Sequence, residues 1–182
     1  MILACFAYFF RLPVKRSSKK HDSWIREFRI CDKTEYEKVI KSETLPEKGA
    51  IRMGEVVSLV SDLTKGDAII VTDVGQNQMS AARYFKFTQP NSLVTSGGMG
   101  TMGFGLPASI GAKIGRPEKQ VVAFLGDGGF QMTIQELGTI LQSNIPVKLI
   151  ILNNGYLGMV RQWQDMFFKK RYASTELVNP DF

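Results

Sequence analysis

The chain has 182 residues, of which 44% are hydrophobic and 22% charged, and its formal net charge is +6 at pH 7. This length fits one domain with a buried core, and the composition is ordinary for a globular protein. The excess positive charge lies mainly in the first 33 residues, without the interleaved aromatic and basic side chains of nucleic-acid-binding proteins. We therefore expect no nucleic-acid partner.

The first 22 residues match nothing that follows, and we expect them to be disordered. Residues 2–10 are apolar but too short to span a bilayer, so we expect no membrane partner. Positive charges follow this apolar stretch, whereas in a secretory signal peptide they precede it. Cys5 and Cys31 form no CxxC motif and are accompanied by one histidine, which predicts reduced thiols and a cytoplasmic location.

Apolar patterns beyond residue 22 predict helices and strands in alternation. The predicted helices cover 34–40, 53–63, 76–85, 103–114, 133–142 and 157–168, and the predicted strands cover 68–72, 92–95, 120–125 and 147–152. The strands are continuous apolar runs rich in β-branched residues. Such strands, separated by helices, indicate an α/β fold with a parallel sheet covered by helices on both faces.

Polar residues follow three of these strands, at the sheet edge where ligands of such folds bind. Asp73 ends one strand, Gly126-Asp127-Gly128-Gly129 ends another, and Asn153-Asn154 follows the most apolar strand. Each turn alone is explained by helix capping or by a left-handed asparagine. Together on one edge, a carboxylate and an amide are hard oxygen ligands that suit Mg²⁺ bound with phosphate. The sequence therefore predicts a metal–diphosphate site.

A dinucleotide-binding Rossmann domain is the distant alternative. Residues 98–103 spell GxGxxG between a predicted strand and a predicted helix, and Asp127 follows at about the distance of a ribose-binding acid. However, glycines flank Asp127 on both sides, and this alternative gives no role to Asn153 and Asn154.

The GDG and NN motifs resemble the signature of thiamine-diphosphate enzymes. The segments DVGQNQMSAARYF, TSGGMGTMGFGLPASIGAKIG, GDGGFQMTIQELGTI and LNNGYLGMVRQWQDMFF closely resemble the cofactor domain of acetolactate (acetohydroxyacid) synthase catalytic subunits. The resemblance runs from about Trp24 to Phe182. It implies that residues 23–48 are the tail of a middle domain and a linker, and that residues 49–182 are a C-terminally truncated thiamine-diphosphate- and magnesium-binding domain.

The resemblance also implies a role for individual residues. Asp127, Asn154 and the backbone carbonyl of Tyr156 are the implied Mg²⁺ ligands. The Gly100 carbonyl would accept a hydrogen bond from the aminopyrimidine, Met102 would be the apolar wedge that bends the cofactor, and Trp163 would line the substrate channel. The full implied cofactor-binding set is Val74, Gly75, Gln76, Asn77, Gly100, Met102, Gly126, Asp127, Gly128, Gly129, Asn154, Tyr156, Leu157, Gly158 and Met159.

The sequence departs from the family at Asn77, where its members usually have histidine. An asparagine amide also donates a hydrogen bond to phosphate, so Asn77 stays in the expected diphosphate site.

The implied reaction condenses pyruvate with a second 2-oxo acid, pyruvate or 2-oxobutanoate, with loss of CO₂, in isoleucine and valine biosynthesis. The implied partners are a second copy in a homodimer and a regulatory small subunit. No catalytic side chain is expected in this chain, because the activating glutamate belongs to the family's N-terminal pyrimidine domain. The FAD-binding middle domain is mostly absent, so we expect little or no activity from this chain alone.

Two alternatives stay open at this point. One is another thiamine-diphosphate enzyme, of the pyruvate oxidase or glyoxylate carboligase type. The other is a non-enzymatic cofactor-binding module that pairs with an intact subunit.

Overall fold

The computed structural model describes residues 21–182, and the chain divides into two compact units with a boundary between Val39 and Ile40. Residues 1–22 were expected to be disordered, and all of them except residues 21 and 22 lie outside the described part of the chain. Helix α2 (Asp22–Glu35) begins at residue 22, which is 12 residues before the start of the helix predicted over residues 34–40. No residue of α2 is buried, so no core-facing stripe marked this helix in the sequence.

A π-helical turn (Tyr36–Ile40) and helix α3 (Lys41–Thr44) follow α2 directly. The helical run ends two residues before Pro46, as the sequence predicted. The residue that precedes a proline avoids the helical conformation, and Leu45 accordingly leaves it, with φ −134° and ψ 61°.

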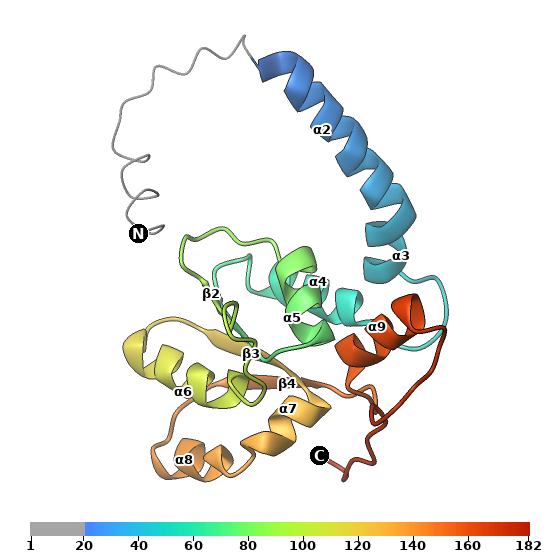
Figure 1. The fold of residues 1–182 in the computed structure, drawn as a ribbon. Coiled ribbons are helices and arrows are strands. Elements are labelled where there is room, and N and C mark those ends of the chain that lie inside the picture. The colour runs from blue at the N-terminus through green and yellow to red at the C-terminus, as the bar shows by residue number, and fades with distance from the viewer. Residues whose placement is uncertain (1–20) are drawn as a thin grey trace. The chain divides into compact units, whose positions relative to one another are not determined.

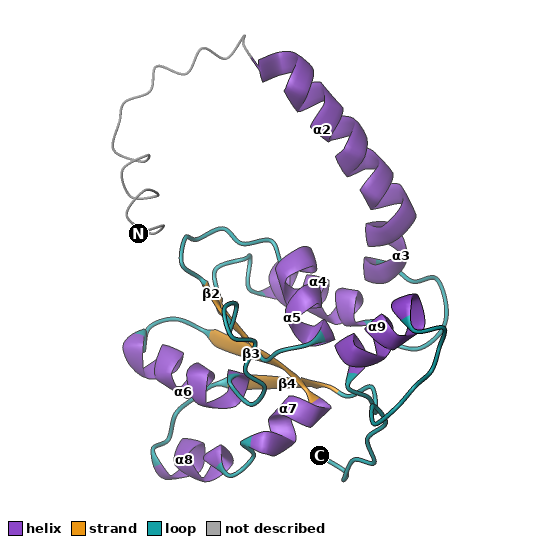
Figure 2. Ribbon diagram, viewed as in Figure 1, coloured by secondary structure: helices purple, strands orange, loops and turns teal. Residues whose placement is uncertain are grey.

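The second unit is built on four parallel strands in the order β2-β1-β3-β4 (Figure 2). The strands are β1 (Ile69–Thr72), β2 (Leu93–Val94), β3 (Val121–Gly126) and β4 (Lys148–Leu152). In the pairing register, Ile70 lies opposite Val122, and Phe124 lies opposite Ile150. The predicted parallel α/β fold is therefore confirmed, and every predicted strand is present.

Alternate residues of the strands form two separate cores, because successive side chains point to opposite faces of a sheet. On one face, Ile70 and Phe124 pack with Val57 of α4 (Met53–Leu63) and Ala81 of α5 (Gln76–Tyr84). Figure 1 shows α4 and α5 together on that side of the sheet.

The opposite core joins Val71 and Leu125 to Leu106 of α6 (Gly105–Gly115) and Phe130 of α7 (Asp127–Met132). Helix α8 (Glu136–Gln142) adds Ile140 to this core, and α6, α7 and α8 lie together on this side in Figure 1. Helices thus cover both faces of the sheet, as predicted.

The helix predicted over residues 133–142 is wrong at its start, because α8 begins only at Glu136 and residues 133–135 separate it from α7, which ends at Met132. The break falls at Thr133, whose hydroxyl donates to the Gly103 carbonyl at 3.1 Å. The hydrogen bond joins the break to a loop 30 residues earlier in the chain. A contact over this separation leaves no local pattern in the sequence.

Helix α9 (Gly158–Phe167) corresponds to the last predicted helix, over residues 157–168. Within residues 21–182, no helix is both long enough and apolar enough to cross a membrane.

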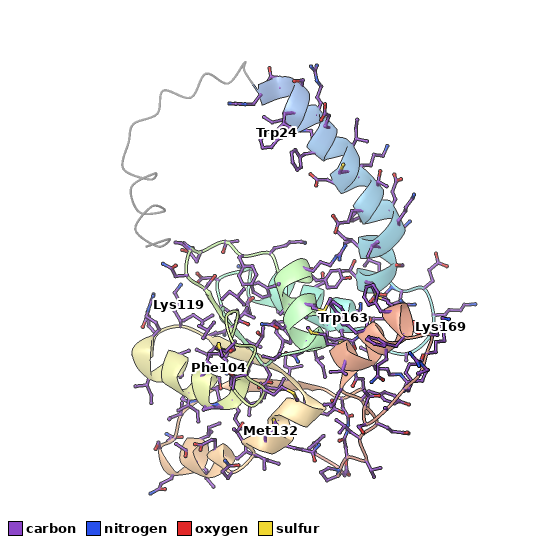
Figure 3. The ribbon with its side chains drawn as sticks, viewed as in Figure 1. Trp24, Phe104, Lys119, Met132, Trp163 and Lys169 are labelled. Atoms are coloured by element: carbon purple, nitrogen blue, oxygen red, sulfur yellow. The ribbon has the colours of Figure 1, made fainter. Side chains whose placement is uncertain are left out.

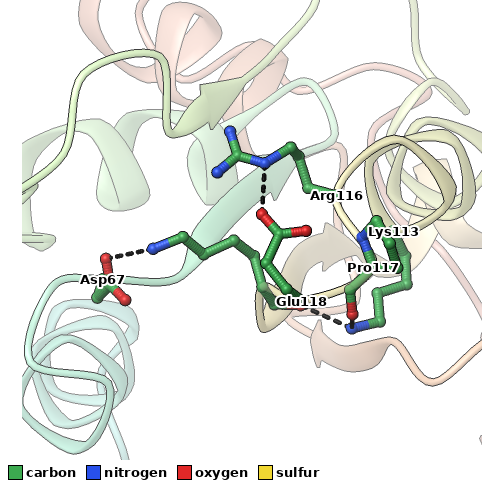
Figure 4. Close-up of polar contacts among 6 residues, drawn as sticks. Asp67, Lys113, Arg116, Pro117 and Glu118 are labelled. Carbon is green, nitrogen blue, oxygen red and sulfur yellow. Dashed lines mark hydrogen bonds and ion pairs between the residues drawn. The ribbon is translucent and has the colours of Figure 1, made fainter.

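A charged cluster ties the amino-terminal ends of β1 and β3 together (Figure 4). Lys119 Nζ lies 2.7 Å from Asp67 Oδ1, while Lys113 Nζ donates to the carbonyls of Pro117 and Lys119 at 2.7 Å each. The hydrogen bond from the Arg116 side chain lowers the pKa of the exposed Glu118 carboxyl. These charges therefore fasten the edge of the sheet that lies opposite to the carboxyl ends of the strands.

Candidate functional site

The strand order creates a switch point between β1 and β3. The chain leaves β1 toward β2 on one side and later continues with β3 on the other, so the loops after β1 and β3 diverge at the carboxyl edge. A cavity opens at this point. Its lining comes from the strand ends, the segments that follow them and two residues further away, and consists of Gly126, Leu152, Val74, Gly75, Gln76, Asn77, Asp127, Gly128, Gly129, Asn154, Tyr156, Leu157, Gly158, Met159, Val160, Met53 and Met102.

Asp127 and Asn154 meet at this cavity, as their positions after neighbouring strands predicted. The Gly155 amide donates to Asp127 Oδ2 at 3.0 Å, which joins the two loops directly. The Asp127 side chain is only 2% exposed. Asn154 Oδ1 accepts the Tyr156 amide at 3.0 Å, and its Nδ2 donates to Gln76 Oε1 at 3.1 Å. All three strand-end loops are therefore linked by hydrogen bonds.

Two helices begin at the cavity wall. Gly75, with φ +128°, precedes the first residue of α5, and α9 begins at Gly158. The first-turn amides of a helix have no acceptor within that helix and carry partial positive charge. The two amino termini consequently offer amide donors that suit an anion such as phosphate.

Gly158 has no room for a side chain. A Cβ at this position would collide with Gln76 Oε1 and would lie 2.7 Å from Asn154 Nδ2. The glycine thus lets the Gln76–Asn154 amide pair pack against the start of α9.

Asn77 carries the unpartnered polar atom of the site. Its side chain is 3% exposed, and Nδ2 donates to the Val74 carbonyl at 3.3 Å. Asn77 Oδ1 is buried and has no hydrogen-bond partner, and no other buried side-chain oxygen or nitrogen within residues 21–182 lacks one. A buried amide with unused hydrogen-bonding capacity in a cavity wall is expected where a polar ligand binds.

Asp73 holds a loop and is not part of the cavity wall. Its carboxylate is fully buried and accepts the amides of Val74 at 2.8 Å, Gly103 at 3.1 Å and Gly105 at 2.8 Å. The start of α6, which follows the GxGxxG segment, is therefore occupied by a protein carboxylate instead of a phosphate. The dinucleotide-binding alternative is wrong for this reason.

Two of the predicted site residues lie outside the cavity wall. Gly100 is exposed with φ +60°, although a Cβ there would lie 3.9 Å from Val74 Cγ1. Trp163 lies on α9 (Figure 3), is 58% exposed, and packs on Phe167 with ring centroids 4.9 Å apart. It lines a separate surface hollow with Val160 and Gln164. The pyrimidine and substrate-channel roles of these residues stay predictions.

An arginine between two tyrosines stiffens one wall of the site. The Arg161 guanidinium carbon lies 4.0 Å from the ring centroid of Tyr156 and 4.2 Å from that of Tyr172. The Tyr172 hydroxyl donates to Asp165 Oδ1 at 2.7 Å, and this hydrogen bond raises the pKa of Tyr172. The stack holds the side chain of Tyr156, which is one of the residues that line the cavity.

Several residues at the site were not predicted from the sequence. Gln131 Nε2 donates to the Asp127 carbonyl at 3.3 Å, and Asn179 Nδ2 donates to Asp127 Oδ2 at 2.6 Å. Met53 and Leu152 also line the cavity. Only Leu152 was within reach of sequence reasoning, because it is the last strand residue before Asn153.

The donor chemistry of the cavity fits Mg²⁺ held jointly with a phosphate. It combines one buried carboxylate with amide and carbonyl oxygens, which are hard ligands. Within the part of the chain that the structure describes, no group of three or more His, Cys, Asp and Glu side chains could hold a metal ion. A site with a single carboxylate leaves the remaining positions to phosphate oxygens and water.

Comparisons with known proteins give the family of the chain. Residues 73–182 match the family described as thiamine pyrophosphate enzyme, C-terminal TPP binding domain. The chain is 51% identical over 138 residues to the acetolactate synthase large subunit of Lactococcus lactis, which covers 75% of this chain and 24% of that protein. It is 47% identical over 165 residues to the mitochondrial acetolactate synthase catalytic subunit of Aspergillus candidus, covering 90% and 23% respectively.

A plant relative shows the same relationship. Chloroplastic acetolactate synthase 1 of Nicotiana tabacum is 55% identical over 124 residues, which are 68% of this chain and 19% of that protein. The chain thus spans about a quarter of the length of the curated relatives that it matches. The matched residues contain all three strand-end loops of the cavity, and the chain belongs to the thiamine pyrophosphate enzyme family.

Proposed function

We propose that this chain is the part of an acetolactate synthase catalytic subunit that binds Mg²⁺ and the diphosphate of thiamine diphosphate. The observation that carries the proposal is the meeting of Asp127 and Asn154 in one cavity at the switch point of the sheet. The identities of about 50% to acetolactate synthases support the choice of this enzyme among thiamine-diphosphate enzymes.

In this proposal the metal ligands are the Asp127 carboxylate, the Asn154 carboxamide oxygen and the Tyr156 carbonyl. The single carboxylate supplies the charge, and the amide–amide bond to Gln76 holds Asn154 with its oxygen side away from Gln76. This donor set leaves room in an octahedral shell for two diphosphate oxygens.

The diphosphate would bind to the amides at the starts of α5 and α9, and to the glycines that follow β3. Gln76 and Asn77 come from α5, while Gly158 and Met159 come from α9. The amino-terminal ends of both helices favour negative charge. Asn77 would donate its second Nδ2 hydrogen to the same anion, since the first is donated to the Val74 carbonyl.

Met102 would support the organic part of the cofactor. It lines the cavity, and its Cε lies 3.6 Å from the Cβ position of Gly128, so an apolar side chain faces the glycine turn. Thiamine diphosphate, when bound, supplies the carbanion chemistry that cleaves and forms bonds to 2-oxo acids. The residues of this chain bind and orient it, and their apolar neighbours exclude water.

The wider assignment follows the relatives. We propose pyruvate and a second 2-oxo acid as substrates, Trp163 as a lining residue of their channel, and FAD, a homodimer and a regulatory small subunit for the intact enzyme. We also propose a cytoplasmic location, as the sequence predicted from its two isolated cysteines.

Calorimetric titration of the 182-residue chain with thiamine diphosphate tests the proposal. We expect binding that requires Mg²⁺ and that Asp127→Ala abolishes, since Asp127 is the one carboxylate among the described residues that line the cavity. Asp181→Ala, which alters an exposed carboxylate near the C-terminus, serves as the control and should bind normally. Binding without metal, or unchanged binding by Asp127→Ala, would refute the metal assignment.

A further inference from the structure

The segment that follows α9 is hydrogen-bonded to the loops that follow β3 and β4. The Leu157 amide donates to the Thr175 carbonyl and the Leu177 amide donates to the Gly155 carbonyl, each at 2.8 Å. These bonds form a short antiparallel bridge, and Thr175 is 3% exposed. The backbone of this segment is therefore fixed beside Asn154 before Asn179 is reached.

Asn179 connects the loops that follow β3 and β4. Its Nδ2 donates to Asp127 Oδ2 at 2.6 Å and to Asn153 Oδ1 at 2.9 Å, so each of its two N–H groups has an acceptor. Its Oδ1 accepts Gln131 Nε2 at 2.8 Å. The amide of Asn179 thus uses both its donors and its acceptor on residues around the proposed metal ligand.

The orientation of this amide follows from its neighbours. Gln131 Nε2 also donates to the Asp127 carbonyl, which only accepts, so the Gln131 nitrogen must face Asn179 and the Asn179 oxygen must face Gln131. The Asn179 nitrogen is then the atom that faces the Asp127 carboxylate.

The two carboxylate oxygens of Asp127 differ in their hydrogen bonds. Oδ2 accepts both the Gly155 amide and Asn179 Nδ2, whereas no hydrogen bond from residues 21–182 reaches Oδ1. One oxygen is satisfied by the protein, and the other is left for a cation. Outer partners that orient a ligating carboxylate in this way strengthen metal binding by about 10- to 100-fold.

We propose that Asn179 is a positioning residue that holds Asp127 by Oδ2 and so presents Oδ1 to Mg²⁺. The inference rests on the proposed function, because it concerns the same metal. It assigns a role in metal binding to a residue outside the GDG and NN motifs, 52 positions after the carboxylate that it holds.

The test measures how much Mg²⁺ is needed for thiamine diphosphate binding. For Asn179→Ala, the Mg²⁺ concentration at half-maximal binding should rise by about 10- to 100-fold, while binding at saturating Mg²⁺ stays at the wild-type level. Asn179→Leu keeps the side-chain volume without the amide and should show the same rise. Val178→Ala is the control, because Val178 is the neighbouring residue and is 97% exposed.

The outcomes separate this inference from the proposed function. If the wild-type chain shows no Mg²⁺-dependent binding, the proposed function fails and this inference fails with it. If the wild type binds and the two Asn179 variants keep its Mg²⁺ requirement, the inference alone is overturned. Reduced binding at saturating Mg²⁺ with an unchanged half-maximal concentration would also overturn it, because that pattern indicates a general structural role.

Discussion

A single buried carboxylate dominates the site at the scale of residues. Asp127 is 2% exposed, and its carboxylate accepts hydrogen bonds from two neutral groups, the Gly155 backbone amide and the Asn179 side-chain amide. A buried charge without an ionic partner is costly unless a cation compensates it. The proposed Mg²⁺ would supply that compensation, which neither of the two amide donors provides.

Gly158 gives a prediction at the same scale. Gly158→Ala would push a methyl group into Gln76 and Asn154, and should displace the amide oxygen that is proposed to bind Mg²⁺. We predict that the dissociation constant of Mg²⁺–thiamine diphosphate rises by at least about tenfold, the equivalent of 1.4 kcal/mol, in a calorimetric titration.

The matched control is Gly111→Ala in α6, where a Cβ meets nothing within 4 Å. This change should leave cofactor binding unaltered and raise the free energy of unfolding by about 0.4 to 1 kcal/mol, because alanine restricts the unfolded chain. Equal binding by both glycine variants would contradict the role given to Gly158.

Single residues were predictable where they belong to local motifs. Asp127 and Asn154 each follow a strongly apolar strand, and the turn glycines beside Asp127 mark that position in the sequence. Asn179 and Gln131 could not be predicted, because their contacts depend on how a segment without periodic pattern crosses the site.

At the scale of elements, the buried Asp73 carboxylate joins β1 to α6. It accepts one amide from its own loop and two from the Gly103–Gly105 segment, so it replaces the N-cap that α6 lacks at Phe104. This bond network also determines where the loop that carries Met102 lies beside the cavity.

We predict that Asp73→Ala lowers the free energy of unfolding by about 3 kcal/mol or more, because three amides lose their charged acceptor. Denaturant unfolding followed by circular dichroism measures this. Asp62→Ala is the comparison, since the Asp62–Lys86 ion pair at 3.5 Å is exposed and should contribute less than about 1 kcal/mol. A loss at Asp73 no larger than that at Asp62 would contradict the structural role.

Elements with a core-facing pattern were predicted well, and those without one were not. Helix α4 occupies the predicted residues 53–63, because Val57 and its neighbours form a helical stripe facing the core. Helix α2 has no buried residue, and the break before α8 depends on the Thr133–Gly103 contact. Neither feature leaves a periodic mark in the sequence.

At the scale of the whole molecule, the order of the strands determines where the site forms. The β2-β1-β3-β4 order places the loops after β1 and β3 on either side of a switch point, and β4 brings Asn154 next to them. The sequence predicted a parallel sheet and its ligand-binding edge. It could not predict the strand order, because order follows from long-range packing and not from any local pattern.

The most direct test of the central claim is a crystal structure of the chain with Mg²⁺ and thiamine diphosphate. We predict Mg²⁺ about 2.0 to 2.1 Å from Asp127 Oδ1, Asn154 Oδ1 and the Tyr156 carbonyl, with diphosphate oxygens completing the shell beside the starts of α5 and α9. Metal or diphosphate bound elsewhere on the chain, with Asp127 and Asn154 outside the coordination shell, would contradict the proposed site.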